Sequence, residues 1–145
     1  MIEWDLPGVH QLEVVVAAES IDVMGHGNNT EYLRFMEKIA WQHTQVLGLG
    51  WDVYQRLNRG MVARHTEVDY LAPAFEGEKL LIGTWIVEND QRLTLTRRYQ
   101  IIRESDGVTL LRGRTKWVCV ALDSGKPKRM PAEFLAGYQV TATEQ

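Results

Sequence analysis

The chain has 145 residues, 45% of them hydrophobic and 24% charged, which is the composition of one globular domain with enough length to bury a core. Its net charge of −3 argues against general binding to nucleic acids, and no stretch is apolar over the roughly 18–20 residues that cross a bilayer. The single cysteine, Cys119, cannot form an internal disulfide, and the N-terminal sequence lacks the basic and apolar regions of a secretory signal. We therefore expect residues 1–145 to form one soluble cytoplasmic domain, with neither a membrane nor a nucleic acid as its partner.

The first predicted element is a strand over residues 10–18, because every second residue there is apolar. A long helix is predicted next, since apolar residues recur at helical spacing from Tyr32 to Leu47. The glycines of the following GLG sequence are expected to end this helix. The sequence GWDVYQRLNRG then favours a second, short helix that ends near Gly60.

The rest of the chain is predicted to be a run of strands joined by short turns. The turns have the sequences APAFEGE, END and SDG. The predicted strands are residues 61–71, 79–88, 92–103 and 108–121. Hairpin connections of this kind give an antiparallel sheet. We therefore expect an α+β fold in which an antiparallel sheet wraps around one long helix, with its other face available for association between subunits.

Two polar residues occupy apolar positions of these elements. Arg97 lies in the apolar phase of the strand over residues 92–103. Because a buried charge needs a partner, Arg97 is expected to face a site, a subunit contact or a buried acid, unless a bulge shifts the phase of the strand. These alternatives stay open from the sequence. His43 lies on the apolar stripe of the long helix and is interpreted as a core histidine rather than a catalytic one.

The loop before the long helix, IDVMGHGNNT, joins one acid to glycines and asparagines. Asn28, Asn29 and Thr30 have side chains that cap a helix N-terminus, and capping alone explains them. Free N–H groups at a helix start also attract negative charge, and two donors aimed at a carbonyl oxygen form an oxyanion hole. Asp22 would then attack the carbonyl carbon or activate water. A thioester suits such a site, because a thiol with a pKa of about 8.5 leaves without strong acid assistance.

The motif DVMGHGNN at residues 22–29, followed by Tyr32 and Glu37, resembles that of the hot-dog-fold acyl-CoA thioesterases. The family pattern Asp-x-x-Gly-His-x-Asn-Asn-x-x-Tyr is met at every defined position. The match is closest to the long-chain acyl-CoA thioesterases of the 4-hydroxybenzoyl-CoA thioesterase superfamily. It covers nearly the whole chain, from the strand before the motif to about Pro131. The resemblance implies a hot-dog fold, in which the sheet wraps around the long helix.

The resemblance also implies a role for each residue of the motif. Asp22 would attack the thioester or activate water, and the backbone N–H of Asn29 would polarise the thioester carbonyl. Tyr32 would belong to the core or the pocket wall. Three further positions would shape the loop: Gly25, His26 and Asn28. Family members are dimers or tetramers with the site between subunits, so we expect a homodimer or homotetramer, and thioester hydrolysis needs no metal or other cofactor.

The sequence departs from the 4-hydroxybenzoyl-CoA enzymes at the turn between the third and fourth strands. Those enzymes carry several basic residues there, in contact with the CoA phosphates, whereas residues 88–92 of this chain contain only Arg92. The next basic cluster, which would meet the phosphates instead, consists of Lys126, Lys128 and Arg129. This departure argues against assigning an aromatic acyl group by simple transfer.

The sequence therefore predicts a thioesterase that hydrolyses acyl-CoA to the free acid and CoA, with medium- to long-chain fatty acyl groups as the expected substrates. Two alternatives remain. One is a hot-dog dehydratase or hydratase that acts on acyl thioesters, which needs an acid–base pair over the acyl chain. The other is a module that binds acyl-CoA without catalysis.

Overall fold

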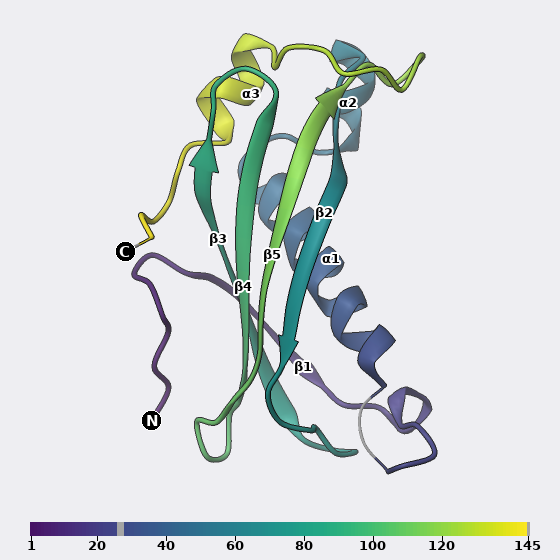
Figure 1. The fold of residues 1–145 in the computed structure, drawn as a ribbon, viewed down its shortest axis with the longest axis vertical. Coiled ribbons are helices and arrows are strands. Elements are labelled where there is room, and N and C mark those ends of the chain that lie inside the picture. The colour runs from purple at the N-terminus through teal and green to yellow at the C-terminus, as the bar shows by residue number, and fades with distance from the viewer. Residues whose placement is uncertain (26–27, 145) are drawn as a thin grey trace.

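The computed structural model describes residues 1–25 and 28–144 of the chain. The elements are β1 (His10–Val15), the 3₁₀ turn η1 (Ala18–Ser20), α1 (Asn29–Val46), α2 (Trp51–Leu57), β2 (Gly60–Tyr70), β3 (Lys79–Asn89), β4 (Thr94–Arg103), β5 (Thr109–Val120) and α3 (Ala132–Gly137). The strands form one antiparallel sheet in the order β1-β3-β4-β5-β2 (Figure 1). The predicted α+β arrangement of a long helix and an antiparallel sheet is confirmed.

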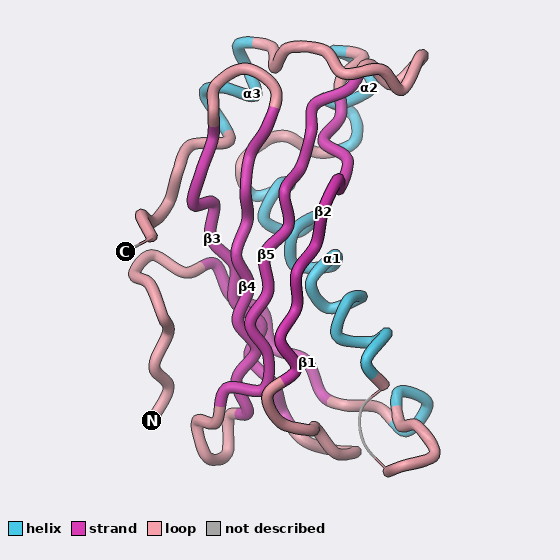
Figure 2. Tube along the Cα trace, viewed as in Figure 1, coloured by secondary structure: helices cyan, strands magenta, loops and turns pink. Residues whose placement is uncertain are grey.

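The helix α1 runs obliquely across one face of the sheet, and α2 and α3 lie together at one end of it (Figures 1 and 2). The loop that precedes α1 lies at the opposite end. The buried side chains of α1 recur at helical spacing and include Met36 and Ile39, which pack in one core cluster with the sheet residues Ile82, Ile101 and Leu111. This apolar contact fixes the direction of α1, and therefore the position of its N-terminus.

A glycine in β5 allows α1 to approach the sheet closely. A Cβ atom at Gly113 would lie 3.0 Å from the terminal methyl carbon of Met36, which is tighter than an ordinary contact between carbon atoms. The absence of a side chain at this position therefore leaves room for the helix.

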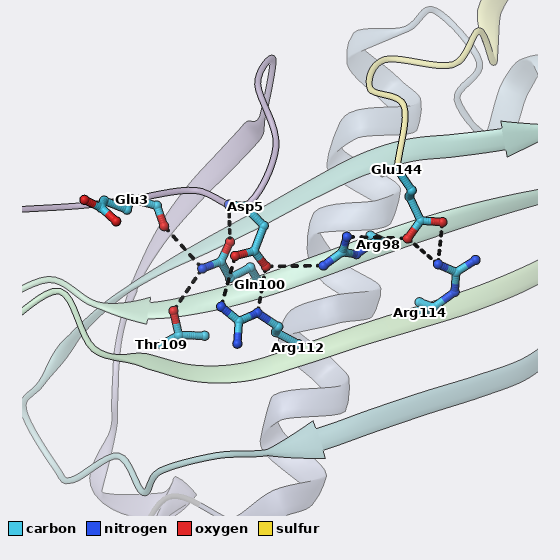
Figure 3. A network of polar contacts seen from close by, with 8 residues as sticks. All are labelled: Glu3, Asp5, Arg98, Gln100, Thr109, Arg112, Arg114 and Glu144. Carbon is cyan, nitrogen blue, oxygen red and sulfur yellow. Dashed lines mark hydrogen bonds and ion pairs between the residues drawn. The ribbon is translucent and has the colours of Figure 1, made fainter.

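The two ends of the chain cover part of the other face of the sheet, which we expected to be available for association between subunits. Trp4, Leu6 and Ala142 pack around Trp85 and Val87 of β3. A polar network continues this cover on the sheet face away from α1 (Figure 3). Its ion pairs join Asp5 to Arg98 and Arg112, and Glu144 to Arg98 and Arg114.

Candidate active site

The start of α1 combines a helix cap with a backbone N–H that has no partner among residues 1–25 and 28–144. The side chain of Asn28 caps the helix, because its Oδ1 accepts a hydrogen bond of 2.8 Å from the N–H of Thr30. The carbonyl of Asn28 accepts the N–H of Glu31 at 2.9 Å. The N–H of Asn29, the first residue of the helix, forms no hydrogen bond with the described residues and lies at the positive end of the helix.

Asp22 is tied into the turn that leads to this helix. Its Oδ1 accepts the N–H of Met24 at 2.9 Å, and its carbonyl accepts the N–H of Gly25 at 3.0 Å. Gly25 has a φ of +79°, a conformation that glycine adopts without steric strain. The N–H of Asn28 donates to the carbonyl of Ser20 at 2.6 Å and so closes the loop. This bond holds the segment of Asp22 near the start of α1.

The other motif positions divide between core and loop. Tyr32 is buried, and its hydroxyl accepts the N–H of Ala74 at 3.0 Å. Burial raises the pKa of Tyr32, so its hydroxyl stays neutral. Its ring packs against those of Phe35 and Tyr70, so Tyr32 is part of the core. His26, which was predicted to shape the loop, lies outside the described residues.

A cavity of about 480 Å³ lies between α1 and the sheet, in the size range of small-molecule sites. Its helix wall begins at Leu33, one turn after Asn29, and ends at Thr44 in the last turns of α1. Its sheet wall comes from β2, β4 and β5. Most of the lining is apolar or aromatic, and it consists of Leu33, Met36, Glu37, Ala40, Trp41, Thr44, Tyr54, Met61, Val62, Ala63, Thr66, Leu95, Arg97, Tyr99, Thr115, Trp117 and Tyr138. Such a lining suits an apolar ligand.

The cavity wall also contains a buried charged group, the guanidinium of Arg97. This side chain is 2% exposed, and its Nη1 donates to Nδ1 of His43 at 2.7 Å and to the hydroxyl of Thr84 at 3.4 Å. Burial, followed by the charge of Arg97 and the neighbouring His10, lowers the pKa of His43 to about 3. His43 is therefore a neutral acceptor inside the protein, and its prediction as a core histidine is confirmed. Arg97 keeps the phase of Leu95 and Tyr99 in the cavity wall, and no acid among the described residues pairs with it.

Sequence reasoning missed the hydroxyl groups beside Arg97. The hydroxyl of Tyr138 lies in hydrogen-bond contact with those of Tyr54 and Thr44, and all three residues line the cavity. Tyr138 follows α3, a segment in which we predicted no element, so no periodic pattern pointed to it. Thr44 lies eight residues after Met36 on the same face of the helix, and this position is the only feature of the sequence that pointed to a buried Thr44.

The predicted CoA-binding residues gather at the other end of the molecule. Arg92, Lys126, Lys128 and Arg129 are all exposed. The carbonyl of Arg92 accepts the N–H of Met130 at 2.8 Å, so the β3–β4 turn and the segment of Arg129 lie side by side. Both are at the end of the sheet that carries α2 and α3, whereas the Asp22 loop is at the opposite end (Figure 1). One chain therefore does not bring its basic cluster to its own Asp22.

The fold and the match to a known family agree on the class of protein. An antiparallel sheet around one long helix is the hot-dog fold that the motif implied. The model of the thioesterase-like superfamily matches residues 15–137, and the chain belongs to this superfamily. A search of the curated proteins finds no match to this chain.

Solved structures with the same fold include several thioesterases. A 1,4-dihydroxy-2-naphthoyl-CoA thioesterase from Synechocystis superposes with a TM-score of 0.80 at 20% identity, over 90% of this chain and 96% of that one. A Staphylococcus aureus protein in complex with CoA gives a TM-score of 0.80 at 18% identity, over 100% and 92% of the two chains. An acyl-ACP thioesterase from Bacteroides thetaiotaomicron gives 0.76 at 21% identity, over 83% of this chain and 49% of that one. At these identities the similarity shows the fold alone.

Among the described residues, no helix is both long enough and apolar enough to span a membrane.

Proposed function

We propose that the protein hydrolyses acyl-CoA thioesters to the free acid and CoA, with medium- to long-chain fatty acyl groups as the first substrates to test. The observation that carries this proposal is the pairing of Asp22 with the start of α1. The Ser20–Asn28 hydrogen bond holds the Asp22 segment at this helix end, and the Asn29 N–H there has no partner among the described residues. Membership in the thioesterase-like superfamily supports the same reaction class.

The proposed mechanism uses the positive end of α1 to stabilise developing negative charge. The thioester carbonyl oxygen accepts a hydrogen bond from the Asn29 N–H. This hydrogen bond strengthens as the oxygen gains negative charge during the attack. Asp22 either attacks the carbonyl carbon or takes a proton from the attacking water. The C–S bond then breaks, and CoA leaves as a thiolate that needs no strong acid beside it.

The cavity behind this helix end suits the acyl chain. It begins at Leu33, about 6 Å from Asn29 along the helix axis at 1.5 Å per residue, and continues beside α1 for most of its length. A carbonyl at the start of α1 would therefore direct its acyl chain along the apolar wall of the helix.

We propose that two copies of the chain share each site. The strand β2 is an edge strand with mostly exposed side chains, and it presents free backbone groups for pairing with a second copy. Antiparallel pairing of β2 with its copy around a two-fold axis would bring opposite ends of the two chains together. The basic residues Arg92, Lys126, Lys128 and Arg129 of one subunit would then approach the Asp22 loop of the other, where the CoA phosphates need cations.

A thiol-release assay over a panel of acyl-CoA substrates tests this function. The panel runs from acetyl-CoA to palmitoyl-CoA, with an aromatic series alongside, and a thiol reagent measures free CoA. We expect turnover that rises with chain length into the medium or long range. Hydration of an enoyl-CoA without thiol release would instead indicate a hydratase. Saturable binding without any turnover would indicate a binding module.

A further inference from the structure

The guanidinium of Arg97 is a buried cation without an acidic partner in the described parts of the chain. Both of its hydrogen-bond acceptors there, His43 and Thr84, are neutral, and both are reached through Nη1. None of the ion pairs of the described residues includes Arg97. A buried charge in this situation is unfavourable unless another group compensates it.

Two donor groups of Arg97 have no partner among the described residues. Nε and Nη2 form no hydrogen bond with the residues that the structure describes. The fully buried polar atoms without a partner do not include them, so neither atom is completely enclosed by protein. Arg97 is itself a lining residue. A guanidinium presents these donors as a planar fork that matches the two oxygens of a carboxylate.

Further hydroxyl groups border the same region. Tyr54, Tyr138 and Thr44 line the cavity and are joined to one another by hydrogen bonds. Burial raises the pKa of both tyrosines, so their hydroxyls stay protonated at neutral pH and supply donors rather than negative charge. The one acid in the cavity lining, Glu37, lies on an exposed part of α1 and makes no ion pair with Arg97. The described residues therefore supply no anion to Arg97.

The position of Arg97 places this anion far from the thioester. Arg97 contacts His43, which lies 14 positions after Asn29 on α1. At 1.5 Å per residue, the two positions are about 21 Å apart along the helix axis. An acyl chain whose carbonyl lies at Asn29 would reach Arg97 only with its distal end.

We propose that Arg97 binds a carboxylate at the distal end of the acyl chain, so that the preferred substrates are CoA monothioesters of dicarboxylic acids. This inference rests on the proposed thioesterase function and narrows its substrate class. The apolar cavity wall holds the methylene chain, and the guanidinium fork with the neighbouring hydroxyls replaces the water that the carboxylate loses.

Matched pairs of substrates test the inference. Each pair has the same number of carbons, from hexanoyl to hexadecanoyl, and one member carries a terminal carboxylate. At the best chain length we expect kcat/KM to be roughly 10- to 100-fold higher for the carboxylate member, the range of a hydrogen bond to a charged group. In Arg97→Met this ratio should fall to about one, and Arg97→Lys should keep part of it, because it retains the charge without the fork. Equal rates within every pair, or the same ratio in Arg97→Met, would overturn the inference.

A neighbouring arginine supplies the control. Arg98 follows Arg97 on β4 but lies on the outer face, paired with Asp5 and Glu144. Arg98→Met removes the same charge from the same strand and should leave the substrate ratio unchanged.

If wild type hydrolyses neither member of any pair, the thioesterase proposal fails, and direct binding still decides the inference. Calorimetry should then show that octanoate binds wild type more tightly than octanol, which has the same chain without a charge, and that Arg97→Met removes this difference. Equal binding of the two ligands to wild type would refute the role of Arg97.

Discussion

At the scale of single residues, the unusual feature is a histidine that stays neutral beside a buried cation. The Nη1 group of Arg97 donates to Nδ1 of His43, so the ring proton of His43 is on Nε2. The ring of His10 stacks on His43 at 4.5 Å between centroids, with an interplanar angle of 17°. A second positive charge on His43 would face Arg97 at close range in a buried site, which explains the lowered pKa.

This arrangement predicts a stability that depends on pH. The pKa of His43 is about 3 in the folded chain and about 6.5 when unfolded, so between these values the unfolded state binds the additional proton. Stability is therefore complete above the unfolded pKa and decreases as the pH falls below it. From about pH 7.5 to about pH 5.5 we expect the free energy of unfolding in urea to fall by about 1 kcal/mol through this one group. His43→Gln should remove this part of the pH dependence, and an identical slope in both proteins would contradict it.

At the scale of elements, the β3–β4 turn depends on one carboxylate. Oδ1 of Asp90 accepts the N–H groups of Arg92, Leu93 and Thr94, and Oδ2 accepts the hydroxyl of Thr94. Burial acts to raise the pKa of Asp90, but the hydrogen bonds from Thr94, Arg92 and Leu93 outweigh it and lower the pKa to about 2. This turn also carries Arg92 of the predicted phosphate-binding group.

Removal of this carboxylate should destabilise the hairpin. We expect Asp90→Ala to lower the free energy of unfolding by about 1–2 kcal/mol, as when a side chain that caps backbone N–H groups is lost. Asp123 is the matched control, because it also lies in an exposed turn and its carboxylate forms no hydrogen bond with the described residues. Urea unfolding of the two variants would show a loss for Asp90→Ala alone. A loss of stability of equal size in Asp123→Ala would argue against the Asp90 hydrogen bonds as the cause of the effect.

The sequence predicted most of these elements because their burial is periodic. The strand predicted over residues 92–103 is β4 (Thr94–Arg103), and the capping residues before Tyr32 correctly marked the start of α1. The first strand ends at Val15 rather than at residue 18, because Ala18–Ser20 form a 3₁₀ turn. The helix α3 was missed, since six residues give no periodic signal, although Phe134 within it is fully buried.

The site was predictable only in part, because its polar contacts join residues that are distant in sequence. The motif pointed to Asp22 and to the cap at Asn28. The pairing of Arg97 with His43, 54 positions away, depends on how α1 crosses β4, and no local pattern encodes it. The adjacency of Arg92 and Arg129 likewise depends on the packing of two loops.

At the scale of the whole molecule, the exposed apolar residues suggest where a second copy binds. Val62 and Tyr70 of β2 are 43% and 44% exposed, and Val23 and Met24 of the Asp22 loop are 99% and 73% exposed. Large apolar side chains gathered on an edge strand and on a candidate catalytic loop are typical of a surface that is covered in an assembly. Association of two copies through this edge would remove these four apolar side chains from water.

The shared site can be tested by complementation between two inactive variants. One variant is Asp22→Asn, and the other carries glutamate at all four basic positions, Arg92, Lys126, Lys128 and Arg129. If each site takes Asp22 from one subunit and the basic cluster from its partner, a mixed dimer has one intact site. Co-expression should then restore about a quarter of the wild-type kcat/KM, because half of the dimers are mixed and each has one of two sites intact. No recovery in a preparation that contains mixed dimers would contradict a site that takes Asp22 from one subunit and the basic cluster from the other.

The central claim is that Asp22 acts on a thioester bound at the N-terminus of α1. The most direct measurement is kcat of Asp22→Asn on the best acyl-CoA, with circular dichroism and urea unfolding to show that the fold is retained. We predict a loss of at least about a hundredfold, the size of the loss when a key polar group is removed from an active site. Turnover within a few-fold of wild type in a folded Asp22→Asn protein would contradict the mechanism.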